Sequence, residues 1–282
     1  MWFLLGDEQC ERWSGTVNYI HCDGPFGCMM MCKNAVLQPL QCNNFFDYIN
    51  TTQHLIFPGG GVYFWWQAGV IQALRERFDL KNGNFSMHGA SAGSVSCVMA
   101  ACDVNMHDAM QANFNLPAKS DVFTHGRLVE LFQRILPHDC HILCSGKVNI
   151  SVTKITASCM PLHRKVINTF SSKQDLIDAC LTSSHIPWFL DGQFSRSFRG
   201  DRCVDGSVLF LLHNKPWTGP ELNQGALVIY HGDDTALMEH NWGVLHTLDK
   251  KSLVGMFNMG HAYATREWVQ NIPGGASHVS VV

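Results

Sequence analysis

The chain has few charged residues and no concentrated positive charge. Only 15% of its 282 residues are charged, and the formal net charge is −3. No run of five or more basic residues occurs. The electrostatic pattern of a nucleic-acid-binding protein is therefore lacking, and we expect no nucleic-acid partner.

Long apolar runs and an export leader are also missing. No stretch approaches the roughly 18 consecutive apolar residues that suggest a membrane-spanning helix. The apolar start over residues 1–5 is followed at once by Gly6-Asp7-Glu8, and no positive charge precedes it. It is too short for the apolar core of a signal peptide. We therefore expect a cytoplasmic protein whose 12 cysteines remain reduced thiols.

Paired C-x-x-C motifs are absent as well, although cysteines are frequent near the N-terminus. A zinc site there would need Cys28 and Cys32 together with Cys10 and Cys22, or with His21. This spacing lacks the paired signature of structural zinc sites. We expect no metal and no other cofactor.

The hydrophobic pattern divides the chain near residue 53. Residues 1–52 show no sustained period of 2 or 3.6, and we expect an irregular, Cys-rich extension. Residues 53–282 alternate short apolar runs with stretches of helical period, which predicts an α/β domain on a mostly parallel sheet. The expected strands cover residues 54–57, 85–88, 148–155, 165–169, 202–204 and 226–230. The expected helices cover residues 66–77, 95–102, 105–114, 125–136, 175–181 and 260–271.

One serine lies in a strand–turn–helix pattern. The segment Gly89-Ala90-Ser91-Ala92-Gly93 follows an expected strand and precedes a nearly all-apolar helix. Glycines two residues before and after the serine let strand and helix approach closely, as in a nucleophile elbow. Such a turn presents the hydroxyl beside the free N–H groups of the helix N-terminus. Ser91 is the predicted nucleophile, and Gly89 and Gly93 support its turn.

Two further loops are expected at the same edge of the sheet. Gly59-Gly60-Gly61 follows the strand over 54–57 and offers backbone N–H groups that can hold an oxyanion. Asp205-Gly206 follows the strand over 202–204. Since sites of open α/β sheets lie at the carboxyl ends of the strands, the three loops predict one site.

The residues alone leave the general base open. Asp205 could act directly on Ser91 as a dyad, which requires partial burial and neighbouring hydrogen-bond donors. A Ser-Asp-His triad would need a histidine further along the chain. Four histidines are candidates by position: His231, His240, His246 and His261.

The order of the three motifs resembles the patatin-like phospholipase family, above all its branch with adipose triglyceride lipase and adiponutrin. In that family a glycine-rich oxyanion loop, a G-x-S-x-G serine and a D-G-[GA] aspartate follow one another. The matching segments here are Gly59-Gly60-Gly61, Gly89-Ala90-Ser91-Ala92-Gly93 and Asp205-Gly206-Ser207, and the likeness runs from about Leu55 to Ser207.

The resemblance implies a three-layer α/β/α fold and a Ser91–Asp205 dyad. It also implies an oxyanion hole at Gly59, Gly60 and Gly61, with Gly206 as the motif glycine. The implied activity is that of a lipid acyl hydrolase, of triacylglycerol lipase or phospholipase A type, working through an acyl-enzyme. The expected partner is a lipid ester at a membrane or lipid-droplet surface, with peripheral association; a protein co-activator is left open.

Departures from the family pattern keep two alternatives open. Phe64 stands at the last glycine of the oxyanion loop, Ser207 follows Asp-Gly, and Asn214-Lys215-Pro216 replaces an Asp-Asn-x-Pro segment at a shifted offset. A catalytically weak lipid-binding or regulatory protein is one alternative, and an acyltransferase on the same scaffold is the other. The aromatic residues 64–66 and 188–189 belong either to the core or to an apolar lip beside the site.

Overall fold

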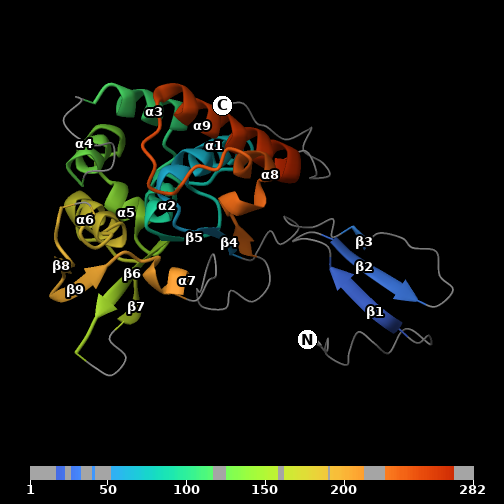
Figure 1. Ribbon diagram of the computed structural model, residues 1–282, viewed down its shortest axis with the longest axis horizontal. Coiled ribbons are helices and arrows are strands. Elements are labelled where there is room, and N and C mark those ends of the chain that lie inside the picture. The colour runs from blue at the N-terminus through green and yellow to red at the C-terminus, as the bar shows by residue number, and fades with distance from the viewer. Residues whose placement is uncertain are drawn as a thin grey trace. The chain divides into compact units, whose positions relative to one another are not determined.

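The structure is a computed structural model that describes residues 17–22, 27–32, 40–41, 52–116, 125–157, 162–189, 191–212 and 226–269. The described residues fall into two units, one within residues 1–49 and one within residues 50–271 (Figure 1).

The first unit contains a small antiparallel sheet. Its strands are β1 (Val17–Cys22), β2 (Gly27–Cys32) and β3 (Leu40–Gln41), in the order β1-β2-β3. The expectation of an irregular extension is therefore wrong for these strands. The methionine run in β2 hides the alternation that would have revealed a strand. The side chains of the zinc alternative lie outside the described part of the chain.

The second unit is built on a mixed sheet in the order β10-β4-β5-β6-β9-β8, with β7 also paired to β6. Neighbours from β10 to β6 are parallel, whereas β7 and β9 pair antiparallel with β6, and β8 with β9. The α/β class is confirmed, although the parallel part of the sheet ends at β6. The strands are β4 (Gln53–Phe57), β5 (Phe85–Ala90), β6 (Val148–Ile155), β7 (Leu162–Ile167), β8 (Arg196–Phe198), β9 (Asp201–Val204) and β10 (Ala226–Val228).

The parallel register aligns the loops that carry the sequence motifs. Phe57 at the end of β4 lies opposite Gly89 of β5, and Ala90 lies opposite Ser151 of β6. The chain therefore leaves β4 and β5 at one edge of the sheet. The central part of one face of β4, β5 and β6 is apolar and packs against α2 (Ala92–Ala101), whose residues are all buried. That face is formed by Leu55, Phe57, Met87, Val148, Ile150 and Val152.

The six expected helices are present, one of them with a corrected start, and the described chain contains three further short helices that were not expected. The closing helix α9 runs from Lys250 to Ala264, ten residues earlier than expected at its start, and continues as a π-helix, η4 (Thr265–Val269). Its start is fixed by Asp249, whose side chain accepts a hydrogen bond from the Ser252 N–H. The other helices are α1 (Phe64–Arg75), α3 (Met106–Phe114), α4 (His125–Ile135), α5 (Cys140–Cys144), α6 (Lys173–Ser183), α7 (Val208–Leu212) and α8 (Thr235–Met238), with 3₁₀ turns η2 (Gly61–Tyr63) and η3 (His231–Asp233).

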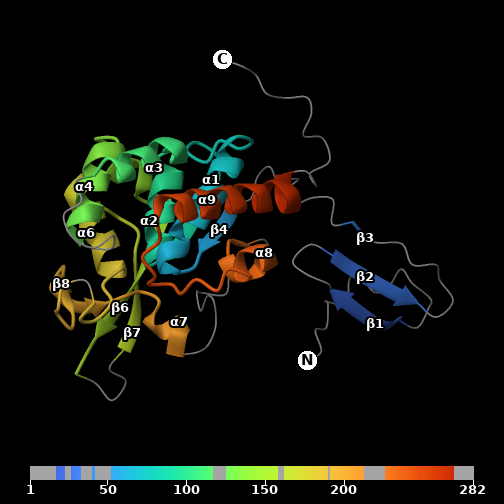
Figure 2. The same cartoon turned by 45° about the horizontal axis from the view of Figure 1, so that its top comes forward.

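Helices α1 and α9 lie side by side, as both ribbon views show (Figures 1 and 2). Two glycines make their backbones meet. A Cβ at Gly69 would lie 1.9 Å from the Phe257 carbonyl oxygen, and a Cβ at Gly260 would lie 2.0 Å from the Trp66 carbonyl oxygen. Both contacts are with backbone, which cannot turn aside as a flexible side chain could.

We expect Gly69→Ala to lower the free energy of unfolding by about 2–4 kcal/mol, because the added methyl group forces the two helices apart. Thermal and denaturant unfolding would measure the loss. Gly255→Ala in α9 is the matched control, since no atom lies within 4 Å of its added Cβ. That change should stabilise the protein by up to about 1 kcal/mol through helix propensity. Equal effects of the two substitutions would contradict the close packing.

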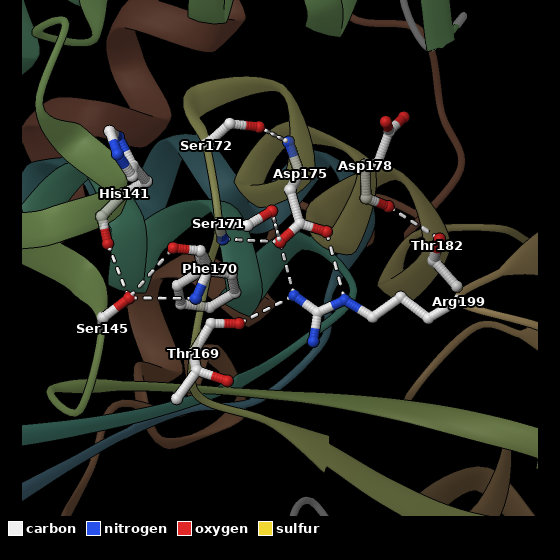
Figure 3. A network of polar contacts seen from close by, with 10 residues as sticks. All are labelled: His141, Ser145, Thr169, Phe170, Ser171, Ser172, Asp175, Asp178, Thr182 and Arg199. Atoms are coloured by element: carbon white, nitrogen blue, oxygen red, sulfur yellow. Dashed lines mark hydrogen bonds and ion pairs between the residues drawn. The ribbon is translucent and has the colours of Figure 1, made fainter.

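A polar network fixes the start of α6 (Figure 3). The Arg199 guanidinium donates two hydrogen bonds to the Asp175 carboxylate, at 3.1 and 2.6 Å, and one to the Thr169 carbonyl at 2.7 Å. Asp175 also accepts from the Ser171 N–H, and the Ser172 side chain caps the helix. This bidentate pair holds α6 in place, and α6 carries at its other end the residues that support the candidate site.

Candidate active site

Ser91 lies at the tight turn between β5 and α2 and has a strained backbone. Its φ of 52° and ψ of −129° fall in a region that side-chain-bearing residues rarely adopt. A Cβ at Gly93 would lie 1.8 Å from the Phe57 carbonyl oxygen, and one at Gly89 would lie 2.3 Å from the Gly93 carbonyl oxygen. Only glycine fits at either position, so the geometry of a nucleophile elbow is present.

Asp205 follows β9 and is only 4% exposed. Its Oδ1 accepts the Ser207 N–H at 2.7 Å, while Oδ2 is buried and makes no hydrogen bond of standard geometry with a described residue. Burial raises the pKa of Asp205 to about 6, although the nearby hydroxyls of Ser91 and Ser207 favour its charged form. Asp205 is thus a buried carboxyl group whose pKa is raised toward neutrality, with the Ser91 hydroxyl among its neighbours.

The glycine loop contacts both motifs. A Cβ at Gly59 would lie 3.0 Å from the Ser91 Cβ and 2.0 Å from the Ser207 Oγ. Gly61 adopts the left-handed φ of +54° beside the Val244 carbonyl, which explains its lack of a side chain. Neither the Gly59 nor the Gly60 N–H is hydrogen bonded to another backbone group of the described chain. The three loops expected at one sheet edge therefore lie together.

Ser183, at the end of α6, joins these loops and was not identified from the sequence. The Ser91 N–H donates to the Ser183 Oγ at 2.9 Å, and that hydroxyl donates to the Ser151 carbonyl at 2.7 Å. The Gly206 N–H donates to the Ser183 carbonyl at 2.9 Å. No local pattern marks this serine, because all three of its partners are distant in the chain.

Gln67 supports the start of the glycine loop in a similar way. Its Nε2 donates to the Pro58 carbonyl at 2.8 Å, and its Oε1 accepts the Ser96 hydroxyl at 2.7 Å. Gln67 is fully buried in α1. The sequence signal for this role was a glutamine among apolar helix residues, because a buried side-chain amide requires hydrogen-bond partners.

The histidines of the triad alternative do not contact Asp205 through a hydrogen bond in the described chain. The exposed His261 ring pairs with Glu76 at 3.1 Å, His240 stacks on Trp242, and His246 accepts the Gly243 N–H. His231 is buried, but it lies beside Gly60 instead. The arrangement offers a Ser-Asp pair and no Ser-Asp-His relay within the described residues.

The aromatic segments divide between core and surface. Trp65 and Trp66 are buried, and the Trp66 Nε1 donates to Asp234 at 2.8 Å, so the core interpretation holds for both. In contrast, Trp188 is 66% exposed, and Phe189 and Phe194 are each 46% exposed. The rings of Trp188 and Phe194 lie 4.9 Å apart. An exposed aromatic group thus follows directly after His185, whose carbonyl accepts the Asp205 N–H.

Among the described residues, none of the helices has the length and apolar content required to cross a membrane. Residues 214–216, where the shifted Pro segment was noted, lie outside the described chain.

The patatin-like phospholipase family profile matches residues 55–217, more than half of the chain. The chain belongs to this family, and the resemblance seen in the motifs is confirmed.

Three relatives illustrate the likeness. Human omega-hydroxyceramide transacylase is 26% identical over 60% of this chain and 33% of its own. The mouse 1-acylglycerol-3-phosphate O-acyltransferase Pnpla3 is 31% identical over 55% of this chain and 39% of its own. The bovine patatin-like phospholipase domain-containing protein 2 is 28% identical over 56% of this chain and 34% of its own. The aligned region spans only about a third of each relative's length.

Proposed function

We propose that the protein is a lipid acyl hydrolase that uses Ser91 and Asp205 as a catalytic dyad. The observation that carries the proposal is the strained, glycine-flanked Ser91 beside a buried carboxylate whose pKa is raised to about 6. A base with a pKa near the working pH is the most effective proton acceptor. Family membership makes lipid esters the expected substrate class.

In the proposed reaction the Ser91 oxygen attacks the ester carbonyl carbon while its proton moves to the Asp205 carboxylate. The N–H groups of Gly60 and Gly61 hydrogen bond the resulting oxyanion. When the intermediate collapses, the ester C–O bond breaks and the leaving alcohol takes the proton from Asp205, which leaves an acyl-Ser91 ester. Water then attacks that ester and gives a proton to Asp205. As the bond between the acyl carbon and the Ser91 oxygen breaks, Asp205 returns this proton to the Ser91 oxygen and the fatty acid is released.

The exposed aromatic group of Trp188, Phe189 and Phe194 supports delivery of the substrate from a lipid surface. Aromatic rings are favoured where apolar and polar phases meet. The group lies close in the chain to His185, which hydrogen bonds Asp205. We propose peripheral contact with a membrane or lipid droplet through this group.

Acyl transfer is a second candidate, and the names of two relatives favour it. The acyl-enzyme is the same, but an alcohol instead of water receives the acyl group. Incubation with a lipid ester and an added acceptor alcohol separates the two by product. Free fatty acid identifies a hydrolase, and a new ester identifies a transacylase.

We expect a fluorophosphonate to label the folded protein stoichiometrically at Ser91, because the reagent requires an activated serine beside an oxyanion site. Intact-mass and peptide mass spectrometry would locate the adduct. Ser91→Ala should abolish labelling with no change in unfolding temperature above a few degrees. Ser86→Ala, on the preceding strand, serves as the matched control and should label normally. An unlabelled wild-type protein would favour the catalytically weak lipid-binding alternative.

A further inference from the structure

His231 reaches the candidate site from a fourth strand. β10 pairs in parallel with β4, with Val228 opposite Ile56, and the Ile229 N–H continues the pairing by donating to the Ile56 carbonyl at 2.8 Å. The chain leaves β10 at the same edge as the glycine loop leaves β4. The turn η3 begins there with His231.

The imidazole of His231 packs against the glycine loop. A Cβ at Gly60 would lie 3.1 Å from both Nδ1 and Cε1 of the ring. The ring stacks on Tyr63 with centroids 4.1 Å apart and planes 10° from parallel. The Tyr63 hydroxyl in turn donates to the Trp242 carbonyl. At 8% exposure, His231 is almost fully covered.

The Nδ1 atom of this buried ring has an unused hydrogen-bonding capacity among the described residues. Nδ1 makes no hydrogen bond with any described residue. An unsatisfied buried polar group costs about 1–3 kcal/mol, so few persist in native proteins, and those that do need an explanation. Burial lowers the pKa of His231 to about 4, so the ring is neutral near pH 7. A neutral imidazole carries one N–H, which can donate to a developing oxyanion without giving up its proton.

We propose that His231 is a catalytic residue that donates a hydrogen bond from Nδ1 to the carbonyl oxygen of the bound ester. This inference rests on the proposed function. As Ser91 attacks, negative charge grows on that oxygen, and the side-chain donor adds to the backbone donors of the glycine loop. The imidazole proton stays on Nδ1 throughout. When the intermediate collapses, the carbonyl double bond forms again and the hydrogen bond weakens.

Three substitutions at His231 test this role, because they differ in which ring nitrogen they replace. The side-chain amide of Asn can occupy the position of Nδ1, and that of Gln reaches the position of Nε2. Phe keeps the ring that stacks on Tyr63 but removes both nitrogens. We expect His231→Asn to retain kcat within about fivefold, while His231→Gln and His231→Phe lose about 10²- to 10³-fold in kcat with little change in KM. His261→Phe is the control. It should leave kcat unchanged, because the His261 ring pairs with Glu76 and not with Asp205.

A measurement on the unmutated protein covers the case in which a variant fails to fold. In ¹⁵N-histidine-labelled protein, formation of a phosphonyl adduct at Ser91 should move one imidazole N–H proton resonance downfield as it bonds the adduct oxygen. The proposal is overturned if no imidazole N–H resonance responds to the adduct, or if His231→Phe keeps the wild-type kcat. It is also overturned if the Asn and Gln variants lose kcat equally. Failure of Ser91 to form any adduct would instead overturn the proposed function, and the role of His231 with it.

Discussion

Asp205→Asn should abolish turnover and, at the same time, make the protein more stable at neutral pH. The amide still accepts the Ser207 N–H but cannot take the Ser91 proton, so we expect kcat/KM to fall by at least about 10³-fold. Burial raises the pKa of Asp205 from 3.8 to about 6, so the folded protein is disfavoured when this group ionises. A shift of this size corresponds to about 3 kcal/mol at pH 7. Activity assays and thermal unfolding would measure the two effects.

The sign of the pH dependence follows from the same shift. Between pH 4 and pH 6 the folded state binds the Asp205 proton more tightly than the unfolded state, so this group lowers stability as the pH rises. Above pH 6 its contribution is constant. The wild-type kcat/KM should rise with pH and level off above about 6, because the base must be ionised. An Asn variant that is no more stable than the wild type at pH 7, yet gains stability at pH 4, would contradict the assignment.

Replacing Ser91 should have the second large effect. Ser91→Ala and Ser91→Gly both remove the nucleophile, and we expect turnover to fall by about 10⁴-fold or more in each. The two variants should differ in stability, because φ is 52° at this position and glycine adopts it without strain. The relief of strain, about 1–3 kcal/mol, is partly offset by the chain entropy that glycine loses on folding. We therefore expect Ser91→Gly to unfold at a higher temperature than Ser91→Ala.

Equal unfolding temperatures for the two variants would show that the turn is not strained. Retention of ester turnover in Ser91→Ala would exclude Ser91 as the nucleophile, whatever the stability result. Purified protein assayed with a water-soluble ester and with emulsified lipid ester would show whether any residual activity depends on a lipid surface.

Much of the fold was visible in the sequence because its signals are local. The strand at 85–88 and the buried helix after it were both expected from their apolar runs, and α4 was expected to within a residue. The antiparallel direction of the strands beyond β6 was harder to predict from the sequence, because pairing direction depends on how the chain returns to the sheet. The early start of α9 was missed although Leu253, Met256 and Phe257 already recur at helical spacing before Gly260, where the helix was expected to begin.

The residues of the candidate site also divide into those that a local sequence signal reveals and those that it does not. Ser91, Asp205 and the glycine loop lie in short motifs, so the sequence could name them. Ser183, Gln67 and His231 lie in no motif, because each acts through partners that are distant along the chain. Nor could the sequence choose between the Ser-Asp pair and a triad, since several histidines lay at suitable positions.

The chain's own residues determined that a serine would sit in a tight turn between strand and helix. At Gly89 an added Cβ would collide with the Gly93 backbone four residues on, and this requirement is local, whereas at Gly93 it would collide with Phe57 of the neighbouring strand. Only the tertiary structure decided the protonation of the site. The pKa of Asp205 and the neutral state of His231 arise from burial by segments remote in sequence, and desolvation depends on what surrounds a group rather than on its neighbours along the chain.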